Sequence, residues 1–153
     1  MAHRFFSDRD IKTFDKFNKE LIDEVIGQKC ILYKLELSET KTNVYGEAEG
    51  GKNYKNGIEL PCLIEHDDIA YNTDEFGPDS SQNVAFRFHR NTLIEKEAAP
   101  EVGDIIKWNY AFFEINSLNE NNLLGGDTEL NHDVIAQTHL TRPTKVGIDQ
   151  RIK

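Results

Sequence analysis

The sequence contains few of the residues that build reactive or membrane-bound sites. It has two cysteines, one tryptophan, one methionine and four prolines among 153 residues. Cys30 and Cys62 lie within probable strands, so we expect two buried small side chains, with a disulfide as the less favoured alternative. No apolar run approaches the roughly 20 residues of a membrane-spanning helix. Residues 1–8 lack the apolar core of a signal peptide, so we expect synthesis in the cytoplasm and no membrane anchor.

Positive charge is also scarce, because 18 lysines and arginines stand against 27 acidic residues, for a formal net charge of -9. This balance disfavours tight binding to a nucleic-acid backbone, which needs concentrated Lys and Arg. It suits a surface that nucleic acid passes without binding. A small barrel that stacks single-stranded nucleic acid on Phe86, Phe88 and Tyr33 remains an alternative, although alternation along the strand predicts that these rings point inward.

No group of residues predicts catalysis, a cofactor or a metal centre. His132 and His139 are seven residues apart, which places them on opposite faces of one strand. The two carboxylates after His66 are typical of a solvated loop start. Ser80 and Ser81 have no identifiable base beside them, and the glycine pairs lack the lysine spacing of a phosphate-binding loop. We therefore expect a protein that is not an enzyme and that carries no cofactor or metal.

Residues 7–26 predict one helix. Ser7 can cap its first turn, and Gly27 stands where a helix ends. Apolar residues recur every three or four positions, which predicts an amphipathic helix. This stripe packs either on the protein's own sheet, which we favour, or on a neighbouring subunit. Its members are Ile11, Phe14, Phe17, Leu21, Ile22 and Val25.

Residues 102–115 predict a central hairpin that reverses at residues 109–111. This hairpin carries Trp108, which we expect in the buried core with Ile106, Phe113 and Ile115. A glycine or polar residue would be more usual than Tyr110 in the turn, so the turn type is open. Hairpins need further strands to cover their apolar face, and the flanking sequence supplies them.

Four further strands are expected over residues 30–37, 58–66, 83–90 and 133–141. Pro61 predicts an edge or a bulge in the second. In the third, alternation directs Val84, Phe86 and Phe88 inward and Ala85, Arg87 and His89 outward. Long loops are expected over residues 38–57, 67–82 and 118–131. The predicted fold class is mainly β: a small antiparallel β-barrel or sandwich with an N-terminal α-helix and long loops. The expected divisions are a helix (1–27), a barrel domain (28–142) and a tail (143–153).

The loops over residues 38–57 and 67–82 exceed the usual length in a compact domain, so we expect them to contact partners. In the first, Tyr45 and Tyr54 are the expected anchors, because aromatic side chains supply much contact area. The second contains five acidic residues and no lysine or arginine. Its expected interface residues are Asp74, Glu75 and Phe76.

Several stretches together resemble the neck and head-closure proteins of tailed bacteriophages, of the T4-like neck-protein kind. The resemblance spans roughly residues 30–142. It rests on Asn-Val-Tyr-Gly-Glu-Ala at 43–48, Ile-Glu-Leu-Pro-Cys-Leu-Ile-Glu at 58–65, Glu-Val-Gly-Asp-Ile-Ile-Lys-Trp at 101–108, Phe-Phe-Glu-Ile at 112–115, the glycine pair at 125–126, and His132 followed by His-Leu-Thr-Arg at 139–142.

The resemblance implies a structural virion protein, located in the neck after synthesis in the host cytoplasm. It implies a homo-oligomeric ring, hexameric or dodecameric, that contacts a portal or adaptor protein and the tail terminator, tail tube or sheath. Genomic DNA would pass through the ring without specific binding, and an acidic segment such as residues 67–82 suits the wall of such a channel. A tail-completion or baseplate adaptor subunit is the alternative in the same structural class.

Overall fold

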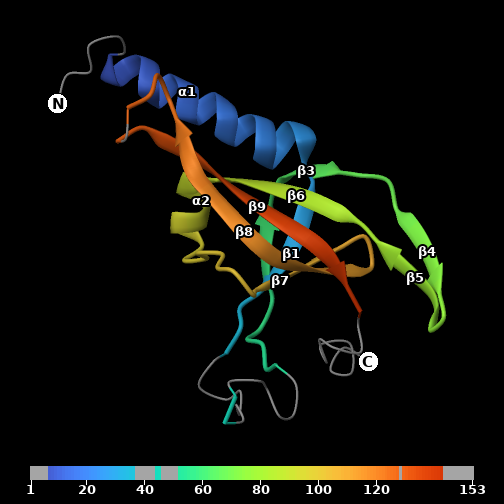
Figure 1. Cartoon of the computed structure of the whole chain (residues 1–153). Helices are drawn as coiled ribbons and strands as arrows, with labels where there is room; N and C mark the ends of the chain where they lie inside the picture. The colour runs from blue at the N-terminus through green and yellow to red at the C-terminus, as the bar shows by residue number, and fades with distance from the viewer. Residues whose placement is uncertain (1–6, 37–43, 46–51, 128, 143–153) are drawn as a thin grey trace.

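The computed structural model of the chain describes residues 7–36, 44–45, 52–127 and 129–142 (Figure 1). It is mainly β with an N-terminal helix, as the sequence predicts. The helices are α1 (Asp8–Glu20), which continues into the π-helical turn η1 (Leu21–Ile26), and the short α2 (Arg90–Glu95). The strands are β1 (Lys29–Tyr33), β2 (Ile58–Pro61), β3 (Leu63–His66), β4 (Ala70–Asp74), β5 (Gly77–Ser81), β6 (Asn83–His89), β7 (Ile105–Trp108), β8 (Ala111–Leu123) and β9 (Asn131–Thr141).

Seven strands form one antiparallel sheet in the order β2-β1-β7-β8-β9-β6-β3, and the sheet curls like a barrel wall (Figure 1). Its two edge strands, β2 and β3, are separated along the chain by Cys62 alone. The single strand predicted over residues 58–66 is therefore wrong in one respect, because it breaks at Cys62 and supplies both edges. Pro61 ends β2 at an edge, where a residue without a backbone N–H is tolerated.

The predicted helix is confirmed, with both of its ends. The Ser7 hydroxyl and the Asp10 side chain form a reciprocal capping box, and the helix ends at Gly27 with a left-handed backbone, φ 62°. The apolar stripe is divided between two sides. Ile22 is buried against the body of the protein, whereas Phe17, Leu21 and Val25 are exposed, so this part of the stripe does not pack on the protein's own sheet.

The main core fills the concave side of the curled sheet. The alternation predicted for β6 is confirmed, because Val84, Phe86 and Phe88 are all buried. They pack with residues from all six of the other strands in the seven-stranded sheet. These residues include Cys30, Leu32, Leu60, Ile64, Ile106, Phe113, Ile115, Val134 and Ala136. A second, smaller cluster lies on the other face and contains Tyr33, Tyr54, Ile105 and Phe112, with Ile31 and Leu35 packed against it.

His89 is buried, and the expectation that it points to solvent is wrong. It ends β6 where α1 crosses that end of the sheet, and its Nε2 atom lies 3.9 Å from Asp15 Oδ1 of the helix. Alternation along β6 correctly places His89 on the face opposite Phe88, but it gives no information about the helix that covers this face. Solvent is therefore excluded from the outer face of β6 at the end where His89 lies.

Two expected loops are largely strands. Residues 67–82 contain the antiparallel hairpin β4–β5, which pairs Ala70 with Ser81 at its base and Asp74 with Gly77 at its tip. Residues 118–123 continue β8, which pairs with β9 as far as Leu123 and Asn131. Asparagine is disfavoured in strands. Pairing with β9 nevertheless accommodates the Asn-rich segment, with three irregularities in the register, at Ile115/Ser117, Asn119/Asn122 and Asn122/Leu123.

The central hairpin is confirmed, and its turn is type I′. Trp108 pairs with Ala111 across a two-residue turn in which Asn109 and Tyr110 both have positive φ, 49° and 62°. Trp108 is half-buried at the rim of the core, with its ring 6.2 Å from Phe86 and 6.1 Å from Phe113 between centroids. It closes the core from the side and is not enclosed by it.

We expect Tyr110→Gly to raise the stability of the isolated protein. Tyr110 is fully exposed and holds a left-handed backbone, which costs a side-chain-bearing residue roughly 1 kcal/mol. Asn-Gly is the favoured pair for this turn. Urea denaturation should give a free energy of unfolding that is higher by about 0.5–1 kcal/mol. Tyr110→Ala is the control, since it removes the ring and keeps the strained backbone; an equal gain in that variant would contradict the backbone explanation.

Candidate assembly surfaces

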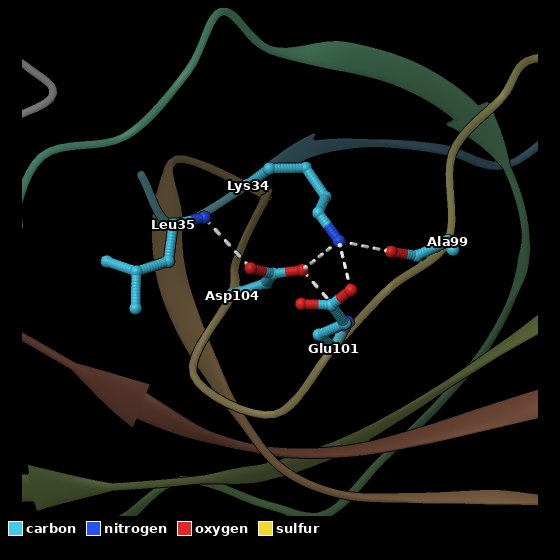
Figure 2. Close-up of polar contacts among 5 residues, drawn as sticks. All are labelled: Lys34, Leu35, Ala99, Glu101 and Asp104. Atoms are coloured by element: carbon cyan, nitrogen blue, oxygen red, sulfur yellow. Dashed lines mark hydrogen bonds and ion pairs between the residues drawn. The ribbon is translucent and has the colours of Figure 1, made fainter. Parts of the chain in front are cut away.

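A polar cluster around the buried Asp104 fixes the point where the chain leaves β1 (Figure 2). Asp104 accepts hydrogen bonds from the backbone N–H groups of Leu35 (2.9 Å) and Glu101 (2.9 Å). The ammonium of Lys34 lies 3.4 Å from Asp104, 3.3 Å from Glu101, and 2.5 Å from the carbonyl oxygen of Ala99. These contacts join the end of β1 to the loop before β7. Because every one of these contacts joins parts of the chain to one another, we interpret the cluster as structural.

The same cluster supports the base of the long segment that follows β1. Leu35 and Tyr54 form a bridge, flanked by the hydrogen bonds Glu36 N–H to Asn53 O and Lys55 N–H to Lys34 O, each 2.8 Å. Most of the predicted loop, residues 37–43 and 46–51, lies outside the described residues. Within the described part, the two ends of the segment therefore pair like the base of a hairpin and leave the body of the protein together.

The two tyrosines predicted as anchors lie in different surroundings. Tyr54 is buried in the second cluster beside Tyr33 and Phe112, and burial, together with the nearby charges of Glu114 and Asp104, raises the pKa of its phenol. Tyr54 thus anchors the segment on its own chain. Tyr45 is exposed. Their role in an interface with another subunit remains a prediction.

The hairpin β4–β5 projects from the curled sheet (Figure 1). Every residue of β4 and all of β5 except the half-buried Gly77 are exposed. At the tip, Asp74 Oδ1 accepts a hydrogen bond from the Phe76 N–H at 2.9 Å, and the Phe76 side chain is 97% exposed. Asp79 forms an ion pair with Arg142 at 3.0 Å. The predicted interface residues Asp74, Glu75 and Phe76 therefore come together in one exposed turn.

A second exposed surface runs along the outer side of α1. A shallow, open depression of about 600 Å³ lies between side chains of α1 alone, and we call it the α1 groove. The exposed Leu21 and Val25 continue its apolar part toward the C-terminal end of the helix. Helical spacing alone marks this stripe as apolar, but it cannot tell which members face the sheet. The groove is lined by Arg9, Lys12, Thr13, Lys16, Phe17 and Glu20.

Between α1 and the sheet lies a cluster of titratable groups. The Phe14 ring meets His132 edge-on at 5.2 Å, and His132 Nε2 lies 3.6 Å from Asp133 Oδ2. Burial raises the pKa of Asp133, and the positive charges of His132, Arg87 and His89 partly offset this rise. Across the residues that the structure describes, no group of three or more His, Cys, Asp or Glu side chains could hold a metal ion.

The raised pKa of Asp133 predicts that Asp133→Asn is stabilising at neutral pH. A carboxyl group with a higher pKa in the folded state binds more protons there than when unfolded, so its contribution is most favourable in acid and is lost as pH rises through the folded pKa. Denaturation at about pH 7 should give the variant the higher free energy of unfolding, and the two proteins should converge toward about pH 3. A wild type more stable than the variant at pH 7 would contradict this.

The two cysteines and the three aromatic residues considered as a stacking surface all lie inside the protein. Cys30 and Cys62 are buried free thiols, and the neighbouring Cys62 together with burial raises the pKa of Cys30 well above its usual range. The rings of Phe86, Phe88 and Tyr33 are buried, so they are not available to stack on nucleic-acid bases. Among the described segments no helix is long and apolar enough to cross a membrane.

The chain was compared with protein-family models, curated protein sequences and solved structures, and only the solved structures gave a match. No protein-family model matches the chain, and no curated protein sequence matches it. Among solved structures, the chain is similar to one chain of a structure described as "Virion of native gene transfer agent (GTA) particle", with a TM-score of 0.48 and 11% sequence identity. The match covers 74% of this chain and 94% of that chain. A likeness of this strength assigns no function.

Proposed function

We propose that this protein is a non-catalytic structural subunit of a tailed-phage particle that assembles with copies of itself into a ring in the neck. The observation that carries the proposal is the hairpin β4–β5, which projects from the curled sheet with Phe76 exposed at its tip. A two-stranded hairpin is marginally stable alone in water. A projecting hairpin with an aromatic tip is therefore typical of an element that is completed by a partner.

The charge of the chain suits a position around passing DNA. The net charge is -9, and residues 67–82 carry five acidic side chains without a lysine or arginine. Such a surface repels phosphate weakly and lets DNA move without being held. The resemblance of residues 30–142 to neck and head-closure proteins supports a hexameric or dodecameric ring that contacts a portal or adaptor protein on one side and tail proteins on the other.

Deleting residues 73–80 should leave the isolated protein folded and impair particle completion. The deletion joins Asn72 to Ser81, so Tyr71 and Asn72 become a two-residue loop between the paired Ala70 and Ser81. Because the removed residues are almost entirely exposed, the thermal midpoint of the isolated protein should change little. Phage that carry the deletion should yield fewer infectious particles, measured by plaque titre. Normal infectivity would contradict a role of the hairpin in assembly.

Localisation in particles tests the proposed position. Antibodies raised against the purified chain should label the head–tail junction of particles in immunogold electron microscopy, and cryo-electron microscopy should resolve a ring there. Label at the distal end of the tail would instead favour the tail-completion or baseplate alternative. Absence of the chain from purified particles would contradict a structural role in the virion.

A further inference from the structure

The hairpin tip and the groove along α1 are complementary in charge, and each presents one exposed aromatic ring. The tip, Asp74, Glu75 and Phe76, combines two carboxylates with one exposed aromatic ring. The Asp74–Phe76 hydrogen bond closes the turn locally and holds the segment in a compact reversal. A paired hairpin of five residues per strand is about 16 Å long, so the tip can reach a surface beyond the body of its own subunit.

The groove along α1 has the opposite charge. Arg9, Lys12 and Lys16 line it against one acidic residue, Glu20, whose carboxylate lies 3.8 Å from the Lys16 ammonium. Of the other acidic residues of α1, Asp10 is bound within the capping box and Asp15 turns toward His89, whereas Asp8 is exposed in the first turn beside Arg9 and is not among the residues that line the groove. The exposed ring of Phe17 supplies an apolar wall in the same groove.

The two surfaces cannot meet within one subunit. In Figure 1 the helix α1 crosses one side of the curled sheet, and the hairpin extends away from it toward the opposite side. The connections between the hairpin and the sheet are short, because three residues separate β3 from β4 and one residue separates β5 from β6. The acidic tip and the basic groove therefore lie on opposite sides of one subunit. This placement suits a contact in which the tip of one copy meets the groove of another copy.

We propose that the hairpin tip of each subunit docks in the α1 groove of the next copy, with Phe76 against Phe17 and with Asp74 and Glu75 near Arg9, Lys12 and Lys16. The contact is heterologous, since two different surfaces meet, and it therefore generates a ring if the rotation closes and a filament if it does not. This inference rests on the proposed ring function and names the two surfaces that build the ring. The charge component weakens as salt is added.

Cysteine cross-linking tests this geometry. The chain offers favourable conditions, because Cys30 and Cys62 are both buried. A Thr13→Cys/Glu75→Cys double variant keeps the rings of Phe17 and Phe76 and places one exposed thiol on each surface. Treated with a short bismaleimide, it should give a ladder of covalent dimers, trimers and higher species. Each single variant contains only one half of the contact and should give no ladder. The reaction is run on the concentrated full-length protein and on particles that contain the variant.

The outcomes separate this inference from the proposed function. A ladder with the double variant alone supports the heterologous contact. Dimers that stop at two subunits in either single variant indicate an isologous contact and overturn it. Cross-links from Thr13→Cys to a different virion protein also overturn it, while the localisation in the neck stands. No ladder in either preparation overturns it as well, and the antibody labelling then decides separately whether the chain is a virion subunit.

A charge exchange provides the second test. Lys12→Glu/Lys16→Glu and Asp74→Lys/Glu75→Lys should each lose self-association in sedimentation velocity, because each places like charges across the contact. Mixing the two variants restores opposite charges at every contact of an alternating assembly, so association should return. Phe76→Ser should weaken association at least about tenfold, whereas Tyr110→Asn, which removes an equally exposed ring from another turn, should not. Mixed variants that remain monomeric while wild type associates would overturn the contact.

Discussion

Replacing Phe113 by alanine is expected to cost the isolated protein about 3–5 kcal/mol of its free energy of unfolding. Phe113 is buried at the centre of the main core, with its ring 5.9 Å from that of Phe86 and 6.1 Å from that of Trp108. The substitution leaves a cavity that the curled sheet can fill only in part. Since a domain of this size has about 5–15 kcal/mol in total, the thermal midpoint should fall by about 10 °C or more.

Phe76→Ala is the matched control for this loss. It makes the same chemical change at a position that is 97% exposed, so the thermal midpoint of the isolated protein should stay within about 1 °C of wild type. Trp108→Ala should fall between the two, because Trp108 covers the rim of the core and is half-buried. Equal midpoints for Phe113→Ala and Phe76→Ala would contradict the core described here.

Replacing Asp104 by alanine is expected to cost about 3 kcal/mol. The change leaves two partly buried backbone N–H groups, those of Leu35 and Glu101, without their acceptor. It also removes the buried carboxylate that faces the Lys34 ammonium. The loss should be visible in urea denaturation as a lower midpoint with an unchanged slope. The base of the segment after β1 should also become more sensitive to proteolysis.

Glu101→Ala is the control for Asp104→Ala. Both carboxylates lie at a similar distance from the Lys34 ammonium, 3.3 Å and 3.4 Å, but the Glu101 side chain is 72% exposed and that of Asp104 only 2%. An exposed ion pair contributes at most about 1 kcal/mol. Lys34 and Asp104 form an ion pair, so the effects of replacing them should not be additive. The loss of unfolding free energy caused by Asp104→Ala should therefore differ by about 0.5–3 kcal/mol between the wild-type and the Lys34→Met background. Equal losses for the two alanine variants would show that burial does not govern this cluster.

The sequence was most informative where local chemistry determines local structure. Ser7 and Gly27 mark both ends of the helix, and alternation along residues 84–88 identifies the inward side chains of β6. The hairpin β4–β5 was missed because its residues alternate between polar types on both faces, so no apolar period distinguishes it from a loop. The extension of β8 was missed because pairing with β9, a tertiary contact, overrides the low strand propensity of asparagine.

The candidate surfaces were predicted in part. Asp74, Glu75 and Phe76 were predicted as interface residues, and the structure places them together at an exposed tip, while Tyr54 lies in a core of its own chain. The groove along α1 was not predicted. Helical spacing gives the width of an apolar stripe, but the orientation of the helix on the sheet decides that Phe17 is outside and Ile22 inside. That orientation depends on contacts with α2 and β9, far away in sequence.

The single residue between the two edge strands has a consequence for how the protein opens. In an open sheet, an edge strand can detach while the rest stays folded, and such local openings need little free energy. Here the backbone passes from β2 through Cys62 directly into β3. Detaching β2 from β1 therefore pulls on the ladder between β3 and β6, so we expect the two edges to exchange their amide protons in the same cooperative event. On this expectation the curled sheet opens as one unit, and independent motion is left to the elements attached to it.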